Sequence, residues 1–202
     1  MIGNADREIT IFSNEGKLFQ VEYSFTAVKN CGYTSVGVKG ESCVYVITQR
    51  KVPDKSIVPS SVTHIFNVNE TIGVLFTGLL PDAKNLLLKM RQNAGEFLEN
   101  FGYTIPISVL AQKMSEECQF YTQQAHMRPL CCISMLFSID DEFGPQLFKL
   151  DPAGSYLGYK ACSTGEKEEA THNFLERELK KKNNITNEEA LSLAIKSLQN
   201  VS

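Results

Sequence analysis

Apolar residues near the start of the chain recur at helical spacing after a polar turn. The turn is Ser13-Asn14-Glu15-Gly16, and the alternation of Ile9 and Ile11 before it predicts a short extended strand. Steps of three, four and three place the apolar residues after the turn on one face of a helix: Leu18, Val21, Phe25 and Val28. Such a helix cannot cover its own apolar face, so we expect it to dock on the body of the chain or on a neighbouring molecule.

Short apolar runs separated by turns fill the next part of the chain. They predict four strands, at residues 34–40, 44–48, 64–68 and 71–76. A polar loop that contains prolines, residues 49–61, separates the two pairs of strands. Because short turns join the members of each pair, we expect antiparallel pairing.

Longer helical patterns come next. An apolar stripe from Ala83 to Phe101 stops at Gly102, and Pro106 suits the first turn of a following helix. Further strands are expected at residues 132–139, 146–150 and 155–160. A last helical pair is expected at about residues 167–181 and 188–201, and Thr186-x-x-Glu189 is a capping box for its second helix.

The order of these elements indicates the fold class. Strands in clusters, separated by clusters of helices, favour antiparallel sheets covered by helix layers over a doubly wound parallel sheet. We therefore expect an α+β fold with two stacked antiparallel sheets. One domain is expected over residues 1–202, with a leading tail and turn at 1–14, a helix at 16–30 and a body at 33–202.

Composition and charge narrow the range of functions. The net charge of −3 gives no electrostatic reason to expect nucleic acid or an anionic membrane as a partner. No apolar run approaches the roughly 20 residues that span a bilayer, and the start of the chain has no secretory pattern. The chain has six cysteines but no Cys-x-x-Cys pair. We expect an intracellular protein with free thiols and with neither metal nor cofactor.

Other polar groups have ordinary structural explanations. The acidic run Asp140-Asp141-Glu142 suits a turn between strands better than a calcium loop. The run Lys180-Lys181-Lys182 suits a solvated helix end better than a nucleic-acid contact. The three histidines, His64, His126 and His172, lie far apart in the sequence and near no nucleophile motif.

The leading segment also resembles the N-terminal signature of 20S proteasome alpha-type subunits. The matching groups are Asp6-Arg7, Thr10-Ile11-Phe12-Ser13, Glu15-Gly16 and Gln20-Val21-Glu22-Tyr23. Similar landmarks follow along the chain: Thr77-Gly78-Leu79, Tyr121-Thr122-Gln123, Arg128-Pro129-Leu130 and Asp151-Pro152-Ala153-Gly154. Val52-Pro53-Asp54-Lys55 and Val62-Thr63-His64 most resemble the type-6, or iota, branch of this family.

The resemblance implies a fold and a role. The fold would be the four-layer αββα sandwich of N-terminal-nucleophile hydrolases. Family members continue past the last helix, so we expect the C-terminal part of that fold to be missing here. The role would be that of a non-catalytic structural and gating subunit in ubiquitin-dependent proteolysis, in the cytoplasm and nucleus. Its partners would be the other alpha subunits of a seven-membered ring, the beta subunits below, and the ATPase regulatory particle or other activators above.

The resemblance also implies site residues. Ala5, Asp6, Asn14 and Tyr23 match the cluster that holds the axial gate open, and Asp6 and Tyr23 retain its hydrogen-bonding groups. A second set matches the pocket for activator C-terminal tails, with a histidine where a lysine is common: His64, Gly32, Gly78 and Leu79. The helical stripe of Leu18, Val21, Phe25 and Val28 would contribute to the ring interface.

Two other functions compete with this interpretation. The related beta subunits are threonine hydrolases, so Thr34 or Ser35 could become a nucleophile after self-processing. Against this, Tyr33 stands where the catalytic threonine would align, and processing would discard the well-specified helix before it. The chain could also be an independent binding module, because a fold alone does not fix a function.

Overall fold

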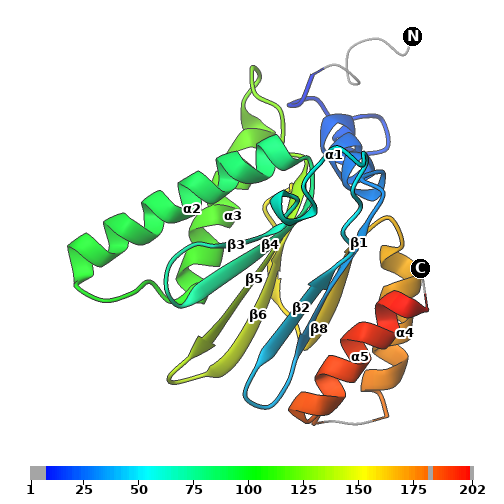
Figure 1. The fold of residues 1–202 in the computed structure, drawn as a ribbon. Helices are drawn as coiled ribbons and strands as arrows, with labels where there is room; N and C mark the ends of the chain where they lie inside the picture. Colours follow the sequence, from blue (N-terminus) through cyan, green and yellow to red (C-terminus); the bar gives the residue numbers. More distant parts are fainter. Residues whose placement is uncertain (1–7, 182–183, 201–202) are drawn as a thin grey trace.

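Two antiparallel sheets face each other between pairs of helices (Figure 1). The structure is a computed structural model and describes residues 8–181 and 184–200. The larger sheet has the strand order β3-β4-β5-β6-β7, and the smaller sheet has the order β2-β1-β8. The strands are β1 (Thr34–Lys39), β2 (Val44–Thr48), β3 (Ile65–Asn67), β4 (Ile72–Gly78), β5 (Cys132–Asp140), β6 (Gly144–Leu150), β7 (Tyr156–Gly158) and β8 (Ala161–Gly165).

Helices cover the outer face of each sheet. Helices α2 and α3 lie on the larger sheet, whereas α4 and α5 lie on the smaller one (Figure 1). The α-helices are α1 (Phe19–Lys29), α2 (Leu80–Phe101), α3 (Ile107–Gln123), α4 (Glu168–Leu179) and α5 (Asn187–Gln199), and a short 3-10 helix, η1, covers Pro59–Ser61. This arrangement is the four-layer αββα sandwich, so the predicted fold class is confirmed.

Three apolar clusters hold the layers together. One lies between α2, α3 and the larger sheet, where Met90, Leu110 and Met114 have no exposed surface. A second, around Leu75 and Met135, lies between the two sheets, and a third lies between the smaller sheet and helices α4 and α5. Full burial of one such side chain stabilises the fold by about 1.5–3 kcal/mol.

Most of the predicted element boundaries agree with the structure. Helix α2 ends at Gly102, whose positive φ of 77° is the left-handed conformation that glycine adopts most easily. Helix α5 begins with the predicted capping box, in which Thr186 and Glu189 each bond the backbone of the other. All six cysteines are free thiols, as expected.

One predicted strand is absent from the structure, and one strand of the structure was not predicted. Ile9 and Ile11 do not form a strand: this stretch is irregular, with Ile9 buried and Ile11 exposed, because no neighbouring strand pairs with it. The strand predicted at residues 155–160 is the short strand β7. A separate strand, β8, follows it and was not predicted. The sequence of β8, Ala161-Cys162-Ser163-Thr164-Gly165, has small side chains with little β-propensity, so its signal is weak.

Helix α1 lies across one end of the sandwich. It contacts β4 and β5 of the larger sheet and β8 of the smaller sheet. Across this end, Val21, Ser24 and Val28 face the body and are buried. The first helix therefore docks on the body of its own chain, which is one of the two possibilities that its apolar stripe left open.

Candidate functional site

The turn before α1 is closed by its own hydrogen bonds. The Ser13 hydroxyl accepts bonds from the amides of Glu15 (3.3 Å) and Lys17 (3.1 Å), and the Ser13 amide donates to the Lys17 carbonyl (2.8 Å). Gly16 has a φ of 75°, a conformation that L side chains rarely adopt. Asn14 is exposed at the tip of this turn. The lead-in to α1 is thus a defined loop that presents Asn14 to solvent.

The stripe predicted on α1 divides between core and surface. Val21 and Val28 are buried against the chain's own body, whereas Leu18 and Phe25 are half-buried. Phe25 also borders a polar pocket of about 130 Å³, which Lys149, Asp151 and Glu168 line as well. Assignment of this stripe to a ring interface stays a prediction, and it now depends on Leu18 and Phe25 rather than on the two valines.

Tyr23 lies on the outward side of α1. Its ring is about half exposed and stacks on Phe19, with ring centroids 6.3 Å apart. The other two residues of the predicted gate cluster, Ala5 and Asp6, lie outside the described residues. The geometry of the predicted cluster is therefore given only for Asn14 and Tyr23.

The residues of the predicted tail pocket gather around Tyr33. The imidazole of His64 stacks on the Tyr33 ring, with centroids 4.3 Å apart. The Tyr33 hydroxyl accepts a hydrogen bond from the Gly78 amide (3.1 Å) and donates one to the Gly78 carbonyl (3.3 Å). Leu79 follows directly and is 45% exposed, and Gly32 precedes Tyr33 with a φ of 80°. The sequence landmarks are thus neighbours in space, and Tyr33 joins them.

The charge at this site comes from residues that the sequence analysis did not single out. Burial lowers the pKa of His64, and the nearby positive charge of Arg50 lowers it further, so the imidazole is neutral at pH 7. Lys51 lies beside Gly32, since a Cβ added to this glycine would be 4.0 Å from the Lys51 ammonium. In the sequence, Arg50 and Lys51 follow shortly after the strand at residues 44–48, and this pair of basic residues is the signal that could have identified the charge of the site.

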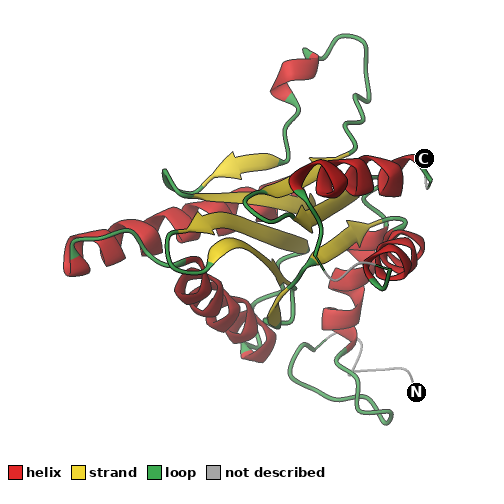
Figure 2. Ribbon diagram, turned by 90° about the horizontal axis from the view of Figure 1, so that it is seen from below, coloured by secondary structure: helices red, strands yellow, loops and turns green. Residues whose placement is uncertain are grey.

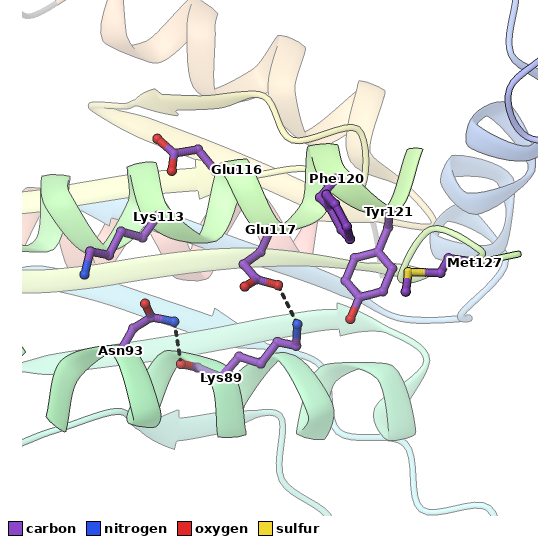
Figure 3. Close-up of a pocket in the computed structure, with 8 residues that line it drawn as sticks. All are labelled: Lys89, Asn93, Lys113, Glu116, Glu117, Phe120, Tyr121 and Met127. Atoms are coloured by element: carbon purple, nitrogen blue, oxygen red, sulfur yellow. Dashed lines mark hydrogen bonds and ion pairs between the residues drawn. The ribbon is translucent and has the colours of Figure 1, made fainter. Parts of the chain in front are cut away.

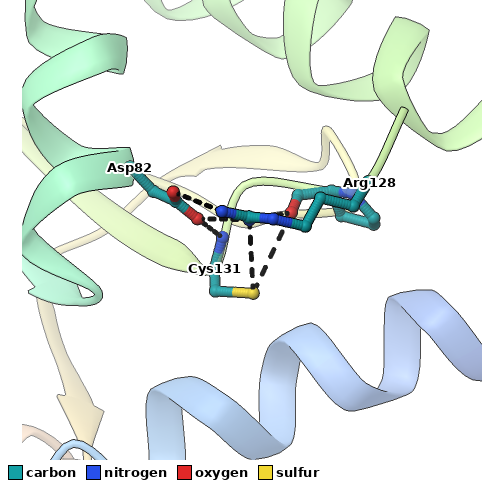
Figure 4. Close-up of polar contacts among 4 residues, drawn as sticks. Asp82, Arg128 and Cys131 are labelled. Carbon is teal, nitrogen blue, oxygen red and sulfur yellow. Dashed lines mark hydrogen bonds and ion pairs between the residues drawn. The ribbon is translucent and has the colours of Figure 1, made fainter. Parts of the chain in front are cut away.

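An ion pair between the buried Asp82 and the exposed Arg128 fixes the backbone beside this pocket (Figure 4). Both carboxylate oxygens of Asp82 accept bonds from the Arg128 guanidinium, at 2.6 and 2.8 Å, and one also accepts the Cys131 amide at 2.9 Å. The bonds from Arg128 hold the pKa of Asp82 below its usual range. Since the Cys131 carbonyl in turn accepts the Leu79 amide (2.9 Å), the pair connects the segment before β5 to the start of α2.

A second surface feature is a groove of about 570 Å³ between α2 and α3 (Figure 3). Lys89 forms an ion pair with Glu117, and its ammonium also lies 5.0 Å from the centre of the Tyr121 ring. Burial would lower the pKa of Lys89, but hydrogen bonds to Glu117 and Tyr121 outweigh it and raise that pKa. Phe120 and Met127 line the groove with about half of their surface exposed. This mixture of apolar and paired charged groups suits contact with another protein.

The two hydroxyls considered as nucleophiles are buried and already bonded. Thr34 and Ser35 have at most 1% of their surface exposed. The Thr34 hydroxyl accepts the Lys167 amide (3.2 Å), and the Ser35 hydroxyl bonds those of Thr48 (2.8 Å) and Thr77 (3.0 Å). Both are strand residues of the core.

The remaining candidates also have structural explanations. The Asp140 carboxylate accepts the amides of Glu142 and Phe143 and so closes a turn between β5 and β6. Lys180 and Lys181 form ion pairs with glutamates of α4. Among the described residues, no three His, Cys, Asp or Glu side chains converge as a metal site would require. In the same residues, no helix is both long and apolar enough to span a membrane.

Comparison with known proteins places these features in one family. Residues 29–202 match the family model for "Proteasome subunit", and residues 6–27 match the model for the N-terminal signature of A-type proteasome subunits. The chain is 51% identical over 176 residues to "Probable proteasome subunit alpha type-1" of Schizosaccharomyces pombe, which covers 87% of this chain and 72% of the relative. It is 42% identical over 194 residues to "Proteasome subunit alpha type-6" of Caenorhabditis elegans, and this alignment covers 96% of this chain and 79% of the relative.

A more distant relative has the same subunit class. The chain is 36% identical over 169 residues to "Proteasome subunit alpha type-2" of Oryza sativa subsp. indica, which covers 84% of this chain and 71% of the relative. Alpha-type subunits are the non-catalytic members of the proteasome, whose beta subunits carry the threonine protease activity. This chain belongs to the proteasome subunit family, as an alpha-type and non-catalytic member.

Proposed function

We propose that this chain is a structural and gating subunit of the outer alpha ring of the 20S proteasome. In that role it would sit among other alpha subunits in a seven-membered ring, scaffold the beta ring below and help to control substrate entry along the axis. Activators such as the ATPase regulatory particle would bind above. The proposal places the subunit in the cytoplasm and nucleus, as part of ubiquitin-dependent protein degradation.

The position of α1 is the observation that carries this proposal. The helix lies across the end shared by both sheets, in contact with β4, β5 and β8. At the start of β1, where a hydrolase of this fold would need an exposed nucleophile, Thr34 is buried. Because no nucleophile is exposed at this end, we infer that the subunit acts through its contact surfaces and not through a catalytic residue. Asn14 at the tip of the turn and Tyr23 on the outer side of α1 are then available to neighbouring subunits.

The pocket around Tyr33 supports a role in activator docking. It combines the exposed Leu79 with the basic residues Arg50 and Lys51, so it offers apolar contact and positive charge to a peptide C-terminus. The groove between α2 and α3 offers a second contact surface, which we assign to a neighbouring subunit. The two surfaces share no residue with the predicted gate cluster, so the three can be tested separately.

Gating can be tested in proteasomes assembled with variants of this subunit. We expect Asp6→Ala and Tyr23→Phe to reduce activator-stimulated hydrolysis of a short peptide, because each removes a hydrogen-bonding group from the predicted open-gate cluster. Tyr45→Phe, in β2, is the matched control and should leave stimulation unchanged. If both variants open as readily as the unmodified particle, the gating part of the proposal is wrong.

A further inference from the structure

Three basic side chains lie at the predicted tail pocket around Tyr33: His64, Arg50 and Lys51. Family resemblance gives His64 the position that would hold the carboxylate of an activator tail. The three side chains differ, however, in charge, in hydrogen-bond partners and in exposure. These differences indicate which of them is best placed to bind an anion.

His64 and Arg50 are poorly suited to hold a carboxylate. The imidazole of His64 is neutral at pH 7, because burial and the positive charge of Arg50 both lower its pKa. Arg50 donates a hydrogen bond to the Pro59 carbonyl (3.2 Å). This bond ties its guanidinium to η1, in the connection between β2 and β3 that projects away from the sheets (Figure 2). An anion bound by Arg50 would have to share the guanidinium with that carbonyl.

Lys51 is exposed and has open space beside its ammonium. Its side chain is 64% exposed, and the ammonium lies 4.0 Å from the point that a Cβ on Gly32 would occupy. Apart from the chain neighbours of Gly32, no other atom of the described residues lies within 4 Å of that point. The φ of Gly32 is 80°, a conformation that L side chains rarely adopt, so this position favours glycine. The backbone at Gly32 therefore leaves the approach to Lys51 open.

Glu166 lies beside Lys51 and pairs with it weakly. The carboxylate and the ammonium are 3.7 Å apart, and the Glu166 side chain is itself 48% exposed. Ion pairs between exposed groups contribute little free energy, so another carboxylate can replace this one at Lys51. The Glu166 amide donates to the Tyr33 carbonyl (3.2 Å), which keeps Glu166 next to the site.

The Tyr33 side chain separates the charged end of the site from its apolar end. Its backbone follows Gly32 and so lies near the Lys51 ammonium. Its hydroxyl bonds the Gly78 backbone, next to Leu79, which is 45% exposed. Positive charge and exposed apolar surface thus lie at opposite ends of one side chain. This arrangement suits an extended peptide whose terminal carboxylate lies at Lys51 and whose preceding apolar side chains contact Leu79.

We propose that Lys51 binds the terminal carboxylate of the activator tail, and that Glu166 occupies Lys51 in the subunit without a tail. The inference rests on the proposed docking function and assigns its charge recognition to a residue other than His64. Binding exchanges one ion pair for another, because the tail carboxylate replaces the Glu166 carboxylate at the Lys51 ammonium. Glu166 therefore lowers the affinity for every tail, and apolar contact at Leu79 has to supply much of the binding.

Calorimetry of the purified 202-residue chain with two synthetic peptides tests the proposal. Both peptides have an acetylated N-terminus and leucines near the C-terminus, and they differ only in a terminal carboxylate or amide. Lys51→Ala should weaken binding of the carboxylate peptide about threefold to tenfold and leave the amide peptide unchanged. Glu166→Gln should tighten the carboxylate peptide about twofold to threefold, because it removes the competing charge. Lys55→Ala, an exposed lysine in the same connection, is the matched control and should change neither peptide.

The two peptides separate failure of this inference from failure of the docking function. If Lys51→Ala binds the carboxylate peptide as tightly as the parent chain does, the inference is wrong and docking stands. Equal weakening of both peptides by Lys51→Ala would also overturn it, since the lysine would then act without recognising the carboxylate. If the parent chain binds neither peptide, the docking function itself is contradicted, and the inference falls with it.

Discussion

Removal of Arg128 should destabilise the protein by leaving a buried carboxylate without its counter-ion. The Asp82 side chain is only 8% exposed, whereas Arg128 is 59% exposed. Breaking a fully buried ion pair costs about 3–5 kcal/mol, and we place Arg128→Ala at about 2–3 kcal/mol because the guanidinium is largely hydrated already. Asp82→Ala should cost about 1–3 kcal/mol, mainly because the Cys131 amide loses its acceptor.

The same pair makes stability depend on pH with a definite sign. Bonds from Arg128 lower the pKa of Asp82 in the folded state, so the unfolded chain binds a proton at higher pH than the native one. The stabilisation is therefore complete above the unfolded pKa of about 3.9 and is lost as the pH falls through the folded value. Arg128→Ala should remove this part of the acid sensitivity.

Urea unfolding at pH 7 and at several pH values between neutrality and the onset of acid unfolding measures both effects. Asp141→Ala, in the exposed turn between β5 and β6, is the control and should change the free energy of unfolding by less than about 0.5 kcal/mol. A double-mutant cycle over Asp82 and Arg128 isolates their coupling. The reasoning fails if Arg128→Ala is as stable as the parent and keeps the same pH profile.

Further substitutions test three other parts of the structure. Gly78→Ala should destabilise by about 3 kcal/mol or more, because its φ is 129° and the new Cβ would lie 2.3 Å from the Cys131 carbonyl oxygen; the matched control Gly95→Ala, in open space on α2, should stabilise by about 0.5–1 kcal/mol. Thermal unfolding separates these outcomes, and equal effects would contradict the strain argument. Thr186→Ala should cost about 1 kcal/mol in urea unfolding through loss of the α5 capping box, and a neutral result would mean that the cap is dispensable. His64→Lys should tighten binding of an activator tail peptide severalfold at pH 7, where the lowered pKa keeps the histidine neutral; calorimetry that finds unchanged affinity between pH 5.5 and 7.5 would show that His64 does not contact the tail.

The sequence predicted the elements whose side chains follow a strong period. The stripe that ends at Gly102 indicated α2, and the Thr186 capping box indicated the start of α5. β8 escaped because its small residues have no β signature, although β1 and α4 pack on it and all five of its residues are buried. The Ile9–Ile11 alternation misled, since alternation makes a strand only where a partner strand lies alongside.

The site was less accessible to sequence reasoning. The grouping of His64, Gly32, Gly78 and Leu79 came from family resemblance, because no spacing rule brings together residues from three separate segments. The role of Tyr33 at their centre, and the bond between Asp82 and Arg128 across 46 residues, depend on the meeting of β1, β4 and the segment before β5. Such contacts follow from the tertiary fold and not from local pattern.

Native mass spectrometry of this chain co-expressed with a full set of alpha and beta subunits tests the central claim most directly. The account predicts that the chain enters a stacked-ring particle as an alpha-ring subunit, with its N-terminal segment intact. Exclusion of the chain from every ring assembly, or its recovery with a new N-terminus at Thr34, would contradict the account.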